Sequence, residues 1–226
     1  MPVSVHIADV GPRTAARLAV RPPDTSATPG LRHRETALAK PFGGELLPRL
    51  QPGRICLLAY WDDDESIDRF LGSDAAAPYA GGWRARLEPL RAYGPWPGLP
   101  DDLPRARKVP DHDGPSVVIT LANTRFTQLH RFLPATRRAE ASVAAAPGLR
   151  WGTAVAKPPF VATISIWDDD AALAEYAYPH ASAHAAAMQA DRSEPFHHDM
   201  TFVRLAPYEL TGALGGRNPV AGDATR

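Results

Sequence analysis

The chain has 226 residues, of which 44% are hydrophobic and 22% charged, so its composition is that of a folded globular protein rather than a disordered one. Its 25 Lys and Arg balance its 25 Asp and Glu, which argues against nucleic acid or an anionic membrane as the main partner, because both select a basic surface. The single cysteine, Cys56, excludes an internal disulfide and a thiolate metal cluster.

The start of the chain carries a polar residue every two or three positions, so it lacks the apolar stretch of a signal peptide. No window of the sequence is as long and apolar as a membrane-spanning helix. We therefore expect a cytoplasmic protein without stable membrane insertion.

In the first half, a short helix is expected at about residues 11–20. The apolar run ICLLAYW, which contains Cys56, is typical of a buried strand. The connector at 94–115 carries six prolines and several charges, which predicts a stiff linker rather than core.

In the second half, residues 116–122 predict a strand, and Thr124 is expected to cap the helix that follows. Pro134 is expected to kink or split this helix, which should end at Pro147-Gly148. The remaining predicted elements are strands at 149–156 and 160–167, a helix capped by Asp168–Asp170 that extends to about residue 191, and a last strand at 199–208.

Short motifs occur twice in the same order, about 106 to 118 residues apart, which indicates a tandem duplication. They are PGLR at 29–32 and 147–150, AKP at 39–41 and 156–158, WDDD at 61–64 and 167–170, and GPWPG at 94–98 opposite GALGG at 212–216.

Each half follows the order β-α-β-β-α-β of a ferredoxin-like unit. We predict an α+β chain with two such repeats at 1–98 and 116–216, a Pro-rich linker at 99–115 and a loose tail at 217–226. Because one unit leaves a face of its sheet bare, two fused copies can stack those faces into a dimeric α/β-barrel within one chain. A cavity between sheets and helices could then hold a ligand.

The stretch YPHASAHAAAM, at 178–188, places His180 and His184 four residues apart on an expected Ala-rich helix. Taken alone, a histidine on a helix is more often structural or exposed than a ligand. The pair lacks the glutamate that makes H-E-x-x-H persuasive as a zinc site. The adjacent histidines of FHHD (196–199) should point in different directions, so a shared metal is not expected there.

Residues 163–192, TISIWDDDAALAEYAYPHASAHAAAMQADR, resemble the spheroidene monooxygenase family of carotenoid ketolases, which has an acidic, Ala-rich helix and a PHA-x-AIR histidine motif. LLAYWDDDESI, PGLR and GPWPG also fall where that family has similar motifs. The closing GALGGRNP (212–219) carries Leu214 where the family has Trp. In the histidine motif, Ala183 replaces a proline and Met188 an isoleucine.

This resemblance implies a monooxygenase that uses haem b, with its iron held by His184, the residue that matches the histidine of the motif. Related haem proteins, such as aldoxime dehydratases and chlorite dismutases, take their proximal histidine from a helix of the C-terminal repeat. A neutral imidazole on a helix that faces an apolar cavity is a good axial ligand. The substrate would be a small apolar molecule, with an external electron donor because the chain carries no reductase domain. A homodimer is left open.

Arg150 and His180 are the candidate catalytic residues, although His180 also suits a plain place in the pocket wall. Arg150 would bind a haem propionate or polarise bound oxygen, or else is a surface arginine at a strand end, like its counterpart Arg32. Arg192 would bind a propionate, or only complement a helix dipole. Residues that would pack a porphyrin edge, or simply belong to the core, are Trp151, Tyr178, Met188 and Phe196.

Three other functions remain open at this point. A haem enzyme without net oxygenation, acting on an N–O bond as aldoxime dehydratases do, predicts ferrous activity without oxygen. A haem- or lipid-binding protein predicts binding without turnover, and the Leu214 substitution favours it mildly. A cofactor-free α/β-barrel monooxygenase predicts a colourless protein.

Overall fold

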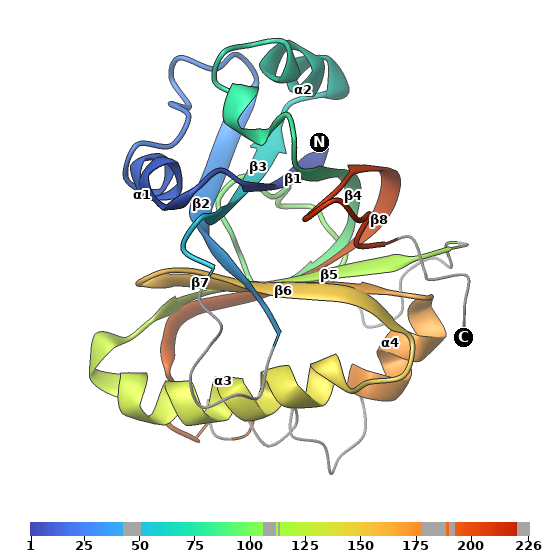
Figure 1. Ribbon diagram of the computed structural model, residues 1–226. Helices are drawn as coiled ribbons and strands as arrows, with labels where there is room; N and C mark the ends of the chain where they lie inside the picture. Colours follow the sequence, from blue (N-terminus) through green and yellow to red (C-terminus); the bar gives the residue numbers. More distant parts are fainter. Residues whose placement is uncertain (43–50, 106–111, 113, 178–188, 190–192, 221–226) are drawn as a thin grey trace.

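The computed structural model describes residues 1–42, 51–105, 112, 114–177, 189 and 193–220 (Figure 1). The first repeat comprises β1 (Val3–Asp9), α1 (Pro12–Val20), β2 (Leu31–Pro41), β3 (Arg54–Trp61), α2 (Asp64–Leu71) and β4 (Trp83–Tyr93). The second comprises β5 (Ser116–Thr124), α3 (Leu129–Ala144), β6 (Leu149–Lys157), β7 (Phe160–Trp167), α4 (Asp170–Ala177) and β8 (His197–Gly212). Short 3-10 turns, η1 (Ala77–Tyr79) and η2 (Phe126–Gln128), precede β4 and α3.

The strands form a closed barrel in the order β1-β3-β2-β6-β7-β5-β8-β4. Two antiparallel seams join the repeats: β2 pairs with β6, and β4 pairs with the long β8. Helices α1 and α2 cover one side of the barrel, and α3 and α4 cover the opposite side (Figure 1). The predicted fold, two ferredoxin-like repeats in an intrachain dimeric α/β-barrel, is confirmed.

The barrel interior is a packed apolar core to which both repeats contribute. The Trp83 and Trp151 rings meet there, with centroids 5.1 Å apart. Trp96 is buried in the same core, so the first part of the Pro-rich connector packs against the barrel instead of acting only as a linker. Burial of a large indole is favourable enough to hold this segment in place.

Two details of the predicted helix after β5 are wrong. Thr124 does not cap it, because this residue ends β5 and its hydroxyl donates to the carbonyl of Pro159 at 3.0 Å. A split at Pro134 is wrong, because α3 runs without a break from Leu129 to Ala144, whereas the alternative, a kink, stays a prediction. Pro134 lies exposed near the start of the helix, where its missing N–H removes a single backbone hydrogen bond.

The WDDD motifs begin helices in both repeats, as predicted. Asp63 accepts a hydrogen bond from the Ser66 backbone N–H at 2.8 Å, and Asp169 accepts one from Ala172 at 2.8 Å. These are N-cap bonds, which satisfy a backbone donor left free at a helix start.

The first and third aspartates of each motif bind arginines at equivalent places in the two repeats. Asp62 pairs with Arg32, and Asp168 with Arg150 at 2.6 Å. Both arginines sit at a β-bulge, where the strand register shifts by one residue. The third aspartates, Asp64 and Asp170, pair with arginines of the last strand of their repeats, Arg86 and Arg204. These ion pairs therefore link the start of the second helix in each repeat, α2 or α4, to strands of the same repeat.

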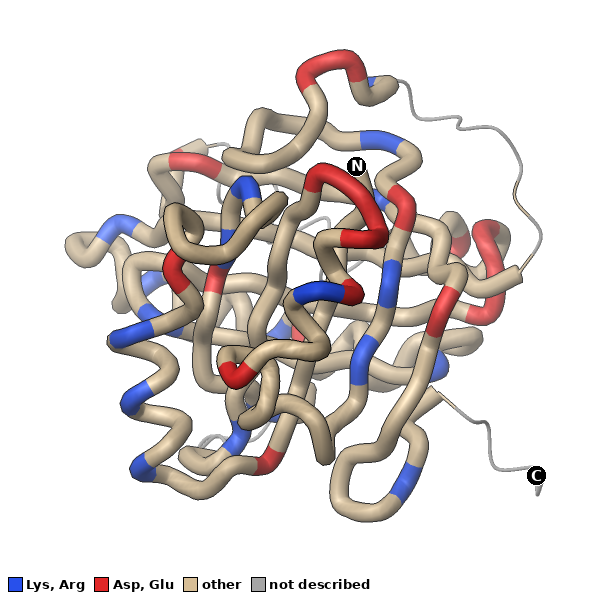
Figure 2. Tube along the Cα trace, turned by 90° about the horizontal axis from the view of Figure 1, so that it is seen from above, with Lys and Arg blue, Asp and Glu red and all other residues tan. Residues whose placement is uncertain are grey.

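Charges of both signs are interspersed along the trace (Figure 2), in keeping with the zero net charge. Among the helices of the described residues, none has the length and apolar character needed to cross a membrane.

His6 is buried between the sheet of repeat 1 and its helices, edge-on to the ring of Phe70. Its Nε2 lies 2.9 Å from the Ser4 hydroxyl. Burial, together with the positive charges of Arg84 and Arg86, lowers the pKa of His6 from 6.5 to about 3. The folded protein therefore keeps this imidazole neutral.

We predict that this residue makes the protein sensitive to acid. Above pH 6.5 the imidazole is neutral in both states and has no effect on the pH dependence. Below that pH the His6 imidazole is protonated in the unfolded chain but stays neutral in the folded one. The free energy of unfolding should therefore fall by up to about 1.4 kcal/mol per pH unit. His6→Gln should flatten this slope in denaturant unfolding between about pH 4.5 and 6.5, whereas the exposed His198→Gln should not. Equal slopes in all three proteins would contradict the assignment.

Candidate functional site

A cavity of about 550 Å³ lies between the sheet of repeat 2 and its helices. The outer faces of the strands form one wall, and α3 and the C-terminal half of α4 form the other. The lining is mostly apolar and includes Val118, Ala154, Ala156, Phe132, Leu173 and Phe196. Such a volume and lining are typical of small-molecule and cofactor sites.

The corresponding space in repeat 1 is filled by side chains of a second apolar core. Ile55, Leu57 and Ala59 of β3 point into that core beside the helices. Alignment of the two WDDD motifs places Val161, Thr163 and Ser165 of β7 at the equivalent positions, where they line the cavity. Val161 and Thr163 are smaller than Ile55 and Leu57, and Ser165 is more polar than Ala59, so these positions fill less of the space in repeat 2. This difference between the repeats contributes to the cavity.

Repeat 1 supplies part of the wall of this cavity. Lys40, at the end of β2, forms an ion pair with Glu140 of α3, whose side chain is only 8% exposed. Phe42 lies against Gly152 of β6, where a Cβ would come within 2.0 Å of the phenylalanine ring. Glycine at 152 leaves room for the Phe42 ring, which a larger side chain at this position would displace.

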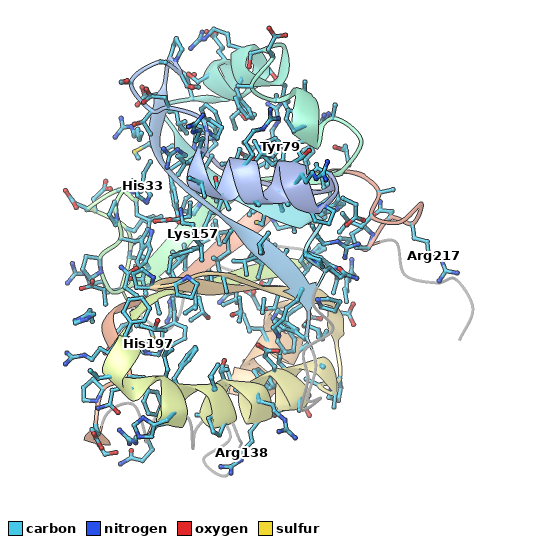
Figure 3. The ribbon with its side chains drawn as sticks, turned by 60° about the vertical axis from the view of Figure 1, so that its left-hand side comes forward. His33, Tyr79, Arg138, Lys157, His197 and Arg217 are labelled. Carbon is cyan, nitrogen blue, oxygen red and sulfur yellow. The ribbon has the colours of Figure 1, made fainter. Side chains whose placement is uncertain are left out.

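His197 lies between the sheet and the start of α3 (Figure 3) and lines the cavity. Its ring is edge-on to that of Phe132, with centroids 5.4 Å apart. The next residue, His198, is exposed, so the adjacent histidines point in different directions, as predicted. The FHHD motif drew attention to this histidine pair. Only the position of β8 shows that His197, and not His198, faces the cavity.

The other predicted residues fall into separate places. Phe196 is buried and lines the cavity, whereas Trp151 packs inside the barrel, on the far face of the sheet. Arg150 is exposed at its bulge, paired with Asp168, and is not among the described residues that line the cavity. Its counterpart Arg32 makes the same pair in repeat 1, which supports the surface role left open for Arg150.

His180, His184, Met188 and Arg192 lie outside the described residues, as does Tyr178. The described residues on either side of this segment border the cavity: Ala177 ends α4 and Phe196 precedes β8, and both line it. Within the described part of the chain, no group of three or more His, Cys, Asp or Glu residues is placed to hold a metal ion.

Comparison with known proteins identifies relatives over most of the chain, although no family model matches it. The chain is 31% identical over 201 residues to spheroidene monooxygenase of Rubrivivax gelatinosus, covering 84% of this chain and 76% of that protein. It is 25% identical over 174 residues to spheroidene monooxygenase of Cereibacter sphaeroides, of whose length it covers 52%.

Among solved structures, an aldoxime dehydratase in complex with butyraldoxime has a similar fold, with a TM-score of 0.53 and 12% identity. The match covers 92% of this chain and 79% of that one. At this identity the likeness concerns the fold alone. The identity of 31% over three quarters of the Rubrivivax gelatinosus protein goes further, and shows that this chain belongs to the spheroidene monooxygenase family.

Proposed function

We propose that the chain is a haem-dependent monooxygenase that inserts oxygen into a small apolar molecule, with the cavity of repeat 2 as its active site. The observation that carries the proposal is the cavity itself, which lies between the sheet and helices of repeat 2 where repeat 1 has a packed apolar core. The monooxygenase relatives support the class of reaction.

The described residues fit a haem. The cavity volume of about 550 Å³ falls within the range of about 300–1,000 Å³ usual for such sites. Small side chains of the sheet, Ala154, Ala156 and Thr163, face α3 across a space that suits a flat apolar macrocycle. Lys40 supplies an ammonium group at the edge of the cavity, where a propionate could meet it.

His184 is the proposed axial ligand. It lies between Ala177 and Phe196 in the sequence, and both of those residues line the cavity. His180 is proposed as a neighbour in the pocket wall, and Met188 and Arg192 as further contacts to the cofactor. Bound haem would supply the activation of dioxygen or peroxide, with electrons from an external donor.

The described side chains have three tasks in this proposal. The apolar walls exclude water and favour an apolar substrate. The rings of Phe132 and Phe196 restrict how that substrate can lie. His197 presents an imidazole to the cavity, where it can donate or accept a hydrogen bond.

The ligand assignment predicts the absorption spectra of three variants. Protein prepared with haem should show a Soret band that shifts or disappears in His184→Ala, because the iron loses its axial imidazole. Arg150→Ala should keep the band and lower stability by less than about 1 kcal/mol, as should Arg32→Ala, because both remove exposed ion pairs.

His180→Ala is the control for a neighbouring histidine and should also keep the band. A band unchanged in His184→Ala but lost in His180→Ala or His197→Ala would move the ligand to that histidine. No Soret band in any preparation would leave the cofactor-free monooxygenase in its place. Turnover of an N–O substrate by ferrous protein without oxygen would favour the dehydratase reaction instead.

Filling the cavity should separate binding from folding. Thr163→Leu restores the residue that repeat 1 carries at the equivalent position, Leu57, and places extra methyl groups in the hollow. We expect haem affinity, measured by Soret titration, to fall at least about tenfold while the melting temperature of the haem-free protein stays the same or rises. Thr14→Leu on α1 is the matched control and should leave haem affinity unchanged. An unchanged affinity in Thr163→Leu would place the haem elsewhere.

A further inference from the structure

A second cavity, of about 450 Å³, lies at one end of the barrel and shares no described lining residue with the cavity of repeat 2. Most of its wall comes from residues 92–105, where β4 ends and the Pro-rich connector begins. Asn123, near the end of β5, and Asp199, near the start of β8, complete it. Its volume falls within the range of about 300–1,000 Å³ usual for small-molecule sites, and the proposed monooxygenase reaction makes no use of it.

The connector that forms this cavity is anchored to the barrel. Trp96 is 6% exposed and packs on Phe160, with ring centroids 5.9 Å apart. The Thr201 hydroxyl donates to the carbonyl of Pro95 at 2.6 Å. The prolines of the connector fix further backbone angles. The cavity is therefore formed before a ligand arrives, which lowers the entropic cost of binding.

The cavity has an apolar floor and a charged rim. Trp96 belongs to the barrel core, and Leu99 and Leu103 pack against that core. Asp101 and Asp199 line the cavity from exposed positions, and neither forms an ion pair within the described part of the chain. Two carboxylates without a cationic partner thus stand beside an apolar floor that contains an indole ring.

The strands turn polar side chains toward this cavity. Asn123 lies directly opposite Asp199 in the pairing of β5 with β8, so the amide and the carboxylate are neighbours. The adjacent residues, Ala122 and Met200, line the cavity of repeat 2, on the other face of the same strands. Arg105 is the one cationic residue among the described residues of the second cavity, so its lining keeps a negative excess.

We propose that this second cavity binds a small organic cation, an amine with an apolar body. The ammonium group would meet the carboxylates of Asp101 and Asp199, with the Asn123 amide oxygen as a further acceptor. The apolar part would lie on the floor beside Trp96, since indole is the aromatic ring that attracts cations best. An anionic ligand would meet two carboxylates and a single guanidinium, Arg105. The site is independent of the proposed function, because it lies on the other face of the strands that line the cavity of repeat 2.

The test is isothermal titration calorimetry of the full chain without haem, with 2-phenylethylamine as the probe. At neutral pH this amine is an ammonium ion, whereas 2-phenylethanol has a similar shape without the charge and phenylacetate has the opposite charge. We expect a dissociation constant for the amine below about 1 mM, at least about fivefold lower than that for the alcohol or for phenylacetate. Binding of the amine should weaken as salt is raised.

Two variants with the same change in net charge separate the site from the overall charge. Asp101→Asn/Asp199→Asn keeps the shape of both side chains and should weaken amine binding about fivefold, while alcohol binding stays within about twofold. The control, Asp74→Asn/Glu88→Gln, removes two exposed carboxylates of repeat 1 that do not line the cavity. It should bind the amine within about twofold of the wild type.

Three results would overturn the proposal. One is the absence of binding heat from 2-phenylethylamine, and another is an alcohol or a phenylacetate that binds as tightly as the amine. The third is an equal loss of amine binding in the control, because binding would then follow net charge alone. Each result leaves the proposed function untouched, since these titrations contain no haem.

Discussion

Pairing between β2 and β6, and between β4 and β8, is the interaction on which the rest of the molecule depends. A ferredoxin-like sheet has two edges with unpaired backbone groups and one bare apolar face, and each is a liability in water. The two seams satisfy the edges of both repeats, and the resulting closure buries both bare faces in one interior. That interior is packed, and the cavity of repeat 2 lies on the outer face of the sheet, beneath the helices.

The two repeats use that outer space in opposite ways. In repeat 1, bulky apolar side chains of β3 meet α1 and α2 and form a solid layer. In repeat 2, smaller side chains of β7 and a helix of 16 residues instead of 9 leave room between the same elements. The aspartate–arginine ion pairs at the starts of α2 and α4 are retained in both repeats, although the packing beneath the helices differs.

Much of the fold could be predicted because the repeated motifs align the two halves and the WDDD aspartates mark two helix starts. The helix after β5 was harder to place. Thr124 has the side chain of an N-cap, but strand pairing extends through it and its hydroxyl binds Pro159 instead. Local preference was overridden there by the sheet.

The site was less accessible to sequence reasoning for two physical reasons. A β-bulge at Arg150 changes the side of the strand on which its side chain lies, and the local sequence pattern does not predict this bulge. Lys40 reaches the cavity from the other repeat, a contact that depends on closure of the barrel. Phe196, by contrast, was expected to pack a porphyrin edge or to belong to the core, and it is buried and lines the cavity.

The seam between β2 and β6 also has an evolutionary meaning. In a homodimer, every substitution appears twice, so a cavity cannot be opened in one subunit and filled in the other. Fusion of the two copies into one chain lifts that symmetry. Repeat 1 could then stay packed and contribute Lys40 and Phe42 to the cavity wall across the seam. Repeat 2 could lose packing and gain a binding space. The two repeats therefore cannot be separated into two functional units, because repeat 1 supplies part of the wall of the cavity in repeat 2.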